Sequence, residues 1–260
     1  MRSRRSRPGG TFQSGTPAQN ELDHRVRSVL QKSAVLKKLP AEAEEAPRKI
    51  YGRKRDRVYL YVRNKILTRE FRPGAMIDPQ EIADTLDVSR TPIQEALTRL
   101  EQEGFIEIIP QVGIFVRTPT SEELFEKLIS RAVLEGLLTK WATPRIGDEE
   151  LRLLEELAEL MNAGQLTAEA YSLVNREFHN VIHVASGLHY VRLLVEHQWN
   201  LVDYTAVIDF VFQPENMRRS SEDHLRILTH LKNREADEAR KAMEAHVMRV
   251  AHLLRERWRG

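Results

Sequence analysis

Three histidines and one asparagine stand at spacings that could build a metal site in a helical segment. Asn175 and His179 are four residues apart, so they share one face of a helix. His224 and His246 are twenty-two residues apart and fall at matching depth on two consecutive expected helices. Imidazole nitrogens with one oxygen ligand suit zinc, nickel or manganese. On spacing alone, histidines that are hydrogen-bonded in a core or exposed on a surface remain an alternative.

The helices that would position these residues fill the second half of the chain. The apolar period from Thr120 onward is helical, with Asp148, Thr167 and Ser221 as expected caps. Six helices in this region predict an antiparallel bundle. The expected helices span residues 121–143, 148–162, 167–186, 188–212, 216–233 and 235–258.

Residues 78–116 carry the most specific local pattern. Asp78 can cap a helix that begins at Pro79, and Thr91 begins a second helix in a similar way. Gly104 ends the second helix, and two short strands joined by a tight turn follow it. Helix, turn, helix and wing are typical of proteins that bind duplex DNA. The expected fold class is therefore mainly α: an N-terminal winged helix-turn-helix followed by an all-α antiparallel bundle.

The start of the second helix of this motif would enter the major groove of DNA. Arg90 can pair with guanine through two hydrogen bonds or clamp a phosphate. Ser89 and Thr91 can bond phosphate, and Gln94 can read an adenine edge. Arg99 lies further along the helix, where backbone or solvent contact is expected.

Three more residues complete the predicted DNA surface. Gln80 opens the first helix, and Gln111 and Gly113 form the wing tip, where a small residue lets the backbone approach the minor groove. For Gln80 and Gln111, DNA contact and a solvated surface position are equally good interpretations.

Composition sets the remaining limits. The 260 residues carry a net charge of only +2, so any surface for nucleic acid must be local. The absence of cysteine fits a reducing cytoplasm, and no apolar run approaches the ~20 residues that span a bilayer. We expect a disordered or partly helical extension at 1–47, a DNA-binding domain at 48–118 and an effector-binding and dimerisation domain at 119–260.

Residues 66–116 resemble the winged helix-turn-helix of the GntR family in the elements FRPG, EIAD-LDVSRTP, EAL-RL, EGFI and VGIFV. The resemblance continues to about residue 258, where the chain is similar to the FCD domain of the FadR subfamily in its VanR-like form. It implies a ligand-responsive regulator, commonly a repressor, which acts as a homodimer on a palindromic double-stranded DNA operator. The family usually has arginine at Gln94 and often a basic residue at Gln80 and Val112, so a changed half-site is expected.

The resemblance also implies a divalent metal ion. Many FCD domains bind one through an aspartate and three histidines, with the aspartate and first histidine in a D-x-x-F-H element. Here that element reads NREFH at residues 175–179, and His224 and His246 fall in the expected contexts. Asn175 thus replaces the aspartate, and a neutral amide oxygen is a poorer donor, so we expect weaker metal binding. His183 is more simply explained as a polar partner than as a ligand.

A pocket for a small organic acid is implied as well. Arg131 matches the R-x-x-L-E start of FCD domains, where the arginine faces the ligand cavity and could hold a carboxylate. A salt bridge from Arg131 to Glu135 is an equally good interpretation. Asn200, Tyr204 and Trp199 are further candidates for lining this cavity.

Two other functions compete with the regulator that senses a metal-supported ligand. A metal-dependent hydrolase would need a general base beside the metal, but Glu177 projects from a different helix face than His179. A DNA-binding regulator with a degenerate effector site would also explain Asn175.

Overall fold

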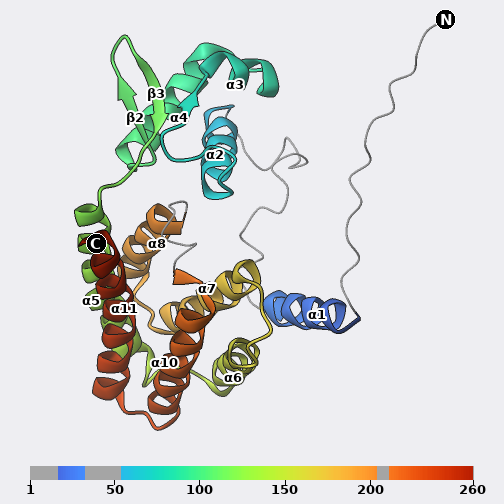
Figure 1. Ribbon diagram of the computed structural model, residues 1–260, viewed down its shortest axis with the longest axis vertical. Coiled ribbons are helices and arrows are strands. Elements are labelled where there is room, and N and C mark those ends of the chain that lie inside the picture. Colours follow the sequence, from blue (N-terminus) through green and yellow to red (C-terminus); the bar gives the residue numbers. More distant parts are fainter. Residues whose placement is uncertain (1–16, 33–53, 204–210, 260) are drawn as a thin grey trace, which may run out of the picture.

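The two largest hydrophobic cores of the described residues organise the chain into a small winged domain and a larger helical domain (Figure 1). The computed structural model describes residues 17–32, 54–203 and 211–259. Tyr204 and most of the predicted N-terminal extension therefore lie outside the described residues. In chain order the elements are α1 (Pro17–Lys32), α2 (Lys54–Leu67), β1 (Met76–Ile77), α3 (Pro79–Leu86), α4 (Arg90–Gln102), β2 (Ile106–Ile109), β3 (Gly113–Val116), α5 (Ser121–Ala142), α6 (Asp148–Asn162), α7 (Ala168–Ala185), α8 (His189–Asp203), α10 (Pro214–Lys232) and α11 (Ala236–Arg259).

The winged domain matches the predicted helix-turn-helix and adds a third strand. Asp78 caps α3, because its side chain accepts a hydrogen bond of 2.8 Å from the Gln80 amide. The sheet order is β1-β3-β2, with both pairs antiparallel. The sequence did not predict β1, since two residues are too few to show an alternating pattern.

Two tight turns connect α4 to the wing and close the wing tip. Gly104 takes a φ of 78°, and the Phe105 amide bonds the Leu100 carbonyl at 2.9 Å, which ends α4 as predicted. At the wing tip the Val112 amide bonds the Ile109 carbonyl at 3.1 Å, while Gln111 takes a φ of 64°. This left-handed residue turns the chain tightly, so β2 and β3 form a short hairpin that extends beyond α4.

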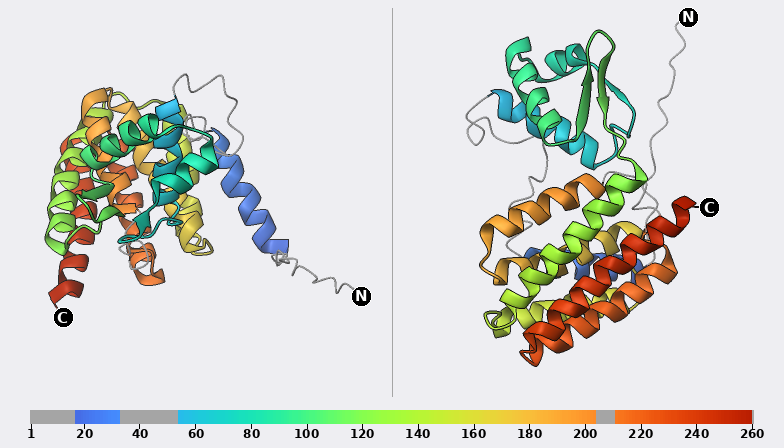
Figure 2. Two further views of the ribbon diagram at one scale, coloured as in Figure 1. Left: turned by 90° about the horizontal axis from the view of Figure 1, so that it is seen from above. Right: turned by 90° about the vertical axis from the view of Figure 1, so that its left-hand side faces the viewer.

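The helical domain is the predicted bundle, in which α5 and α11 run side by side (Figures 1 and 2). Thr167 caps α7 as expected, through a bond of 3.2 Å from the Ala170 amide. The N-cap of α6 is Gly147, so Asp148 is the first helical residue instead of the cap. The predicted cap at Ser221 is wrong: Ser221 lies inside α10 and its hydroxyl donates to the Met217 carbonyl.

The N-terminal helix α1 packs against the helical domain. Leu22, Val26, Val29 and Leu30 are buried in the same core as residues of α6 and α7. This helix at residues 17–32 falls within the extension at 1–47 that was expected to be disordered or partly helical. Among the described residues, no helix has the length and apolar character needed to cross a membrane.

Candidate metal centre and DNA-reading surface

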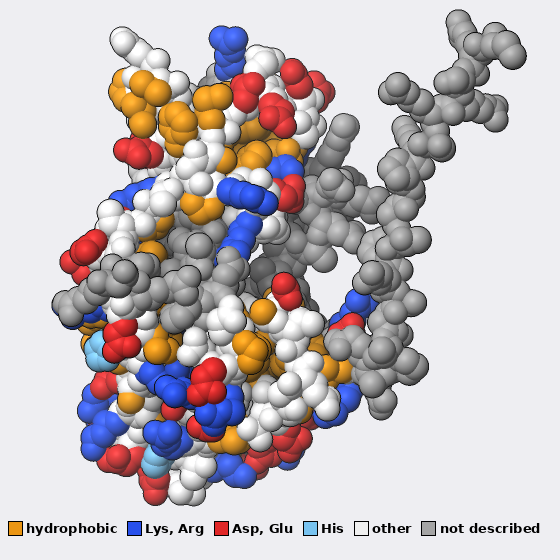
Figure 3. Space-filling view, in the orientation of Figure 1, with side chains coloured by type: hydrophobic (Ala, Val, Ile, Leu, Met, Phe, Trp, Pro, Cys, Tyr) orange, Lys and Arg blue, Asp and Glu red, His pale blue; other side chains and the backbone are white. Residues whose placement is uncertain are grey.

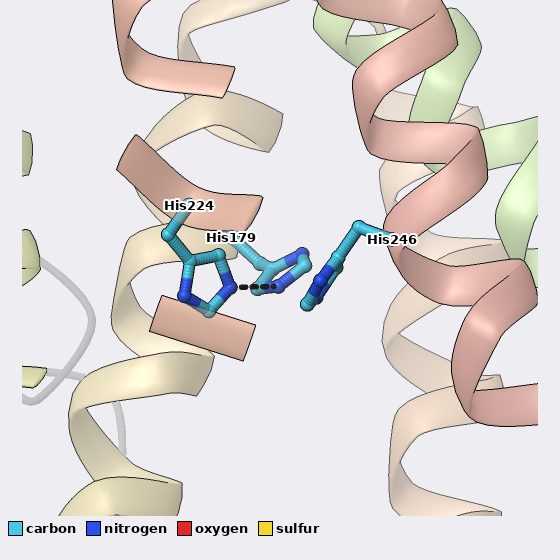
Figure 4. A group of neighbouring side chains, drawn as sticks. All are labelled: His179, His224 and His246. Carbon is cyan, nitrogen blue, oxygen red and sulfur yellow. Dashed lines mark hydrogen bonds between the residues drawn. The ribbon is translucent and has the colours of Figure 1, made fainter. Parts of the chain in front are cut away.

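His179, His224 and His246 converge from α7, α10 and α11 in the interior of the helical domain (Figure 4). Their relative exposures are 1%, 0% and 4%. The Nε2 atoms of His179 and His224 are 3.2 Å apart, and the His246 ring centre lies 5.3 Å from that of His179 and 4.6 Å from that of His224. One nitrogen from each ring lies within 4.8 Å of the other two, so one cation could contact all three.

Asn175 adds a candidate oxygen ligand. It lies one turn before His179 on the same buried face of α7. Its Oδ1 is buried and has no hydrogen-bond partner among the described residues, and the same holds for Nδ1 of His224. Unsatisfied buried polar atoms are rare, because each one loses its hydration without replacement. Three imidazoles and an orphaned amide oxygen therefore fit a divalent cation better than they fit a closed core.

Burial keeps the three imidazoles neutral. It lowers the pKa of His179 to about 4, moves the pKa of His224 well below its usual value and also lowers the pKa of His246. A metal requires a neutral imidazole with a bare nitrogen, and the rings meet that requirement at neutral pH.

A buried carboxylate lies behind the histidines. Glu135 on α5 accepts hydrogen bonds from Nδ1 of His179 at 2.5 Å and from Nε2 of His183 at 3.1 Å. Burial acts to raise the pKa of Glu135, but the hydrogen bonds that it accepts from His179 and His183 hold that pKa well below its usual value. His179, one of the histidines predicted as ligands, is therefore linked to an acid that the sequence suggested only as a partner for Arg131.

Of the predicted effector residues in the described part of the chain, Arg131 and Trp199 lie beside Glu135. Arg131 is buried, its Nε lies 3.0 Å from a Glu135 oxygen, and its guanidinium lies 4.1 Å from the ring centre of Trp199. Trp199 on α8 is also buried and donates from its indole nitrogen to Glu135 at 3.0 Å. Asn200 belongs to α8, but its side chain lies outside the described part. Arg131 and Trp199 thus border the histidines, with Arg131 in the predicted salt bridge.

The predicted DNA-reading residues gather at the start of α4. Ser89 is the N-cap residue but makes no capping hydrogen bond with its side chain. Arg90, Thr91 and Gln94 are exposed, and Arg90 forms no ion pair with any described residue. A helix N-terminus with free amides, a free hydroxyl and an unpaired guanidinium is suited to phosphate.

The other predicted DNA contacts differ in position. Arg99 is held at the far end of α4 by Glu103, at 2.9 Å, and by the Tyr59 ring, whose centre is 3.8 Å from the guanidinium carbon. Arg99 and Arg90 therefore lie at opposite ends of α4. Gln80 is exposed and donates to Asp84 at 3.0 Å, and Gln111 is exposed at the wing tip.

The wing carries an apolar surface that the sequence analysis did not anticipate. Met76 and Val112 are each 65% exposed and Ile109 is 38% exposed, and hydrophobic side chains gather on this part of the domain (Figure 3). A side chain at Gly113 would place its Cβ 3.3 Å from the Phe115 ring and 3.5 Å from the Met76 sulfur. Glycine thus lets these side chains close over the hairpin.

Comparisons with known proteins agree with this arrangement. Residues 54–116 match the bacterial regulatory proteins of the gntR family, and residues 126–249 match the FCD domain. The chain is 32% identical over 191 residues to the Nta operon transcriptional regulator of Aminobacter aminovorans, covering 73% of this chain and 89% of the relative. It is 23% identical to the transcriptional repressor GlaR of Escherichia coli, over 78% of this chain and 96% of the relative. Among solved structures, Escherichia coli McbR/YncC superposes with a TM-score of 0.65 at 22% identity, covering 78% of this chain and 98% of that one.

Proposed function

We propose, because the chain belongs to the GntR family of bacterial regulatory proteins, that it represses transcription and that a small organic acid relieves this repression. It is a DNA-binding transcription regulator with an FCD domain, and its relatives are regulators and not enzymes. The observation that carries the proposal is the convergence of His179, His224 and His246 beside the orphaned Oδ1 of Asn175. We expect the protein to act in the cytoplasm, where its operator lies.

DNA recognition rests on the start of α4 and on the wing. Arg90 contacts guanine or phosphate, Ser89 and Thr91 contact phosphate, and Gln94 reads a base edge. Gln94 and the wing residue Val112 lack the positive charge common in the family. Each missing phosphate contact makes the dependence of affinity on salt shallower by about 0.9 in log–log slope.

The ligand site rests on the histidines and Asn175, which would hold a divalent cation. That cation would supply positive charge to which a carboxylate effector can bind. Asn175 leaves the ligand set without an anion of its own, so an anionic effector and a cation would strengthen each other's binding. The alternative is a DNA-binding regulator whose effector site is degenerate, which the replacement of the usual aspartate by Asn175 would also explain.

The exposed apolar surface of the helical domain supports the proposal of a homodimer. Val133, Leu137 and Trp141 recur every four residues on α5 and are 58%, 36% and 43% exposed. On the neighbouring α8, Tyr190 and Leu193 are 74% and 56% exposed. Two copies joined on these helices would place two winged domains on the two halves of a palindromic operator.

Helix α8 offers a physical route between the ligand site and the DNA-binding domain. Trp199 contacts Glu135 and lies with its ring centre 5.3 Å from that of His179. Two residues earlier, His197 packs edge-on against Phe105, with 6.5 Å between ring centres. Phe105 joins α4 to the wing, so a shift of α8 on effector binding would reach the DNA-reading elements directly.

A thermal-shift and DNA-binding experiment tests the proposal. The protein would be mixed with a panel of small carboxylates, with and without a divalent metal, and compared with His224→Ala. A ligand that binds the native state at 100 times its Kd stabilises it by about 2.7 kcal/mol. We expect one acid class to raise the midpoint only with metal and to release operator DNA. If metal alone raises the midpoint and no acid affects it or DNA binding, the site is degenerate.

A further inference from the structure

Glu135 lies at the centre of a buried hydrogen-bond network behind the histidine cluster. It is fully buried on α5, and both of its carboxylate oxygens are engaged. One oxygen faces His179 and His183, and the other faces Trp199 and Arg131. Four side chains from α5, α7 and α8 therefore meet at one carboxylate.

The chemistry of a carboxylate determines the tautomer of His179. An ionised carboxylate only accepts hydrogen bonds, so Nδ1 of His179 must carry the hydrogen. A neutral ring with a hydrogen on Nδ1 has a bare Nε2. That Nε2 is the atom 3.2 Å from His224, so the bare nitrogen faces the histidine cluster.

The same arrangement supplies charge where the ligand set lacks it. Asn175 contributes a neutral oxygen, and the three imidazoles are neutral as well. Asp223 stands behind His246 at 3.3 Å, and each carboxylate also faces an arginine, Arg249 for Asp223 and Arg131 for Glu135. Burial distinguishes them: Asp223 is 15% exposed, whereas Glu135 is completely enclosed and its charge is less screened by solvent.

We propose that Glu135 is a positioning residue of the metal centre: it fixes His179 with Nε2 toward the cation and provides, through that ring, the negative charge that Asn175 does not. This inference rests on the proposed function, since it assumes that the three histidines hold a cation. Carboxylate groups commonly orient metal-bound histidines in this way, and their loss weakens metal binding by about 10–100-fold.

The same residues offer a second arrangement, because Glu135, His179 and His183 also lie close enough to contact one cation. In that arrangement Glu135 and Nδ1 of His179 would be ligands, and His183 would be essential. Trp199 and Arg131 already engage the second oxygen of Glu135, which favours a fixed acceptor over a ligand. His183→Ala separates the two arrangements: positioning predicts less than a threefold loss of metal affinity, whereas chelation predicts a loss as large as that of His224→Ala.

The main test measures metal affinity in Glu135 variants of the full chain. Zn²⁺ and Co²⁺ affinities would be determined by competition with a chromophoric chelator for Glu135→Gln and Glu135→Asp. Glu177→Gln is the matched control, because it also removes a buried carboxylate. Glu177 lies on α7, on a different face of that helix from His179. We expect a 10–100-fold loss in Glu135→Gln, a smaller loss in Glu135→Asp and no change in the control.

A second measurement does not depend on the variants folding. Long-range ¹H–¹⁵N spectra of the metal-free wild-type protein report which nitrogen of His179 carries the hydrogen. We expect the hydrogen on Nδ1 in the wild type and in Glu177→Gln, and a mixture of tautomers in Glu135→Gln.

The outcomes distinguish the two proposals. Wild-type metal affinity in Glu135→Gln, or a hydrogen on Nε2 of His179 in the wild type, would overturn the role of Glu135 and leave the proposed function intact. A wild-type protein that binds neither metal would instead overturn the metal site of the proposed function, and the role of Glu135 with it.

Discussion

The Nε2 atoms of His179 and His224 face each other at 3.2 Å in the interior of the helical domain. If Nδ1 of His179 donates its hydrogen bond to Glu135, then Nε2 of His179 has no hydrogen. The hydrogen between the two Nε2 atoms must then belong to His224. Nδ1 of His224 is then a buried acceptor without a described partner. For a cation to bind Nε2 of His224, this hydrogen would have to move to Nδ1 of the same ring, so metal binding would change the tautomer of His224 without releasing a proton.

Asn175→Asp should strengthen metal binding. The substitution restores an anionic oxygen on the buried face of α7, one turn before His179. We expect a gain of at least about tenfold in Zn²⁺ affinity, which corresponds to ~1.4 kcal/mol. Asn180→Asp is the matched control, since it adds the same charge to the same helix on another face. Equal gains in both variants would mean that net charge, and not the position of Asn175, controls metal affinity.

The metal-free protein should lose stability as the pH falls from about 6.5 toward 4. The pKa of His179 is lowered from 6.5 to about 4 by burial, so the unfolded state binds its proton in this window and the native state does not. Stability is therefore fully present above pH 6.5 and declines toward pH 4, by roughly 3 kcal/mol from His179 alone. Denaturant titrations with a chelator at pH 7 and pH 5 measure the change, and a flat profile would show that His179 is not enclosed as described.

Arg90→Ala should weaken operator binding, whereas Arg99→Ala should not. Arg90 at the start of α4 has no ion-pair partner in the described part of the chain, while Arg99 is held by Glu103 and Tyr59 at the other end. We expect Arg90→Ala to cost about 1–3 kcal/mol if it pairs with guanine, or to reduce the salt slope by about 0.9 if it binds phosphate. Affinities measured from 50 to 200 mM salt on a selected operator test this. Equal losses in the two variants would contradict the assigned orientation of α4.

Trp141→Glu should convert the proposed dimer to a monomer. Trp141 is 43% exposed in the apolar stripe of α5, and a buried unpaired carboxylate at an interface is strongly unfavourable. Leu225→Glu is the control, because Leu225 is 37% exposed on α10, away from that stripe. Sedimentation velocity should show a smaller species for Trp141→Glu only. A wild-type monomer, or a dimer that survives Trp141→Glu, would remove α5 as the interface.

The sequence predicted the winged motif in detail because its signals are local. Asp78 at the start of α3 and Gly104 at the end of α4 act through bonds to neighbouring backbone groups, and such bonds need no knowledge of distant residues. Ser221 shows the limit of that reasoning. A serine is a common cap, but here its hydroxyl lies inside α10 and contacts the Tyr171 hydroxyl at 3.1 Å.

The candidate site needed tertiary information that periodicity does not carry. Sequence spacing placed His179, His224 and His246 at matching positions along their helices. It could not show which face of each helix points toward the core. Glu135 was considered only as a partner of Arg131, although it falls on the buried stripe of α5 between Leu128 and Leu138. A charged residue on such a stripe is a usable signal, because a buried carboxylate requires partners.

Metal content measured on protein purified without chelator tests the central claim most directly. Elemental analysis of the wild type, His224→Ala and Asn180→Asp would count divalent ions per chain. The proposed site predicts about one ion per chain in the wild type and in Asn180→Asp, and none in His224→Ala, whose cluster has lost a ligand. A stoichiometric ion that remains in His224→Ala, or a wild type that stays metal-free after incubation with Zn²⁺, Ni²⁺ and Mn²⁺, would contradict it.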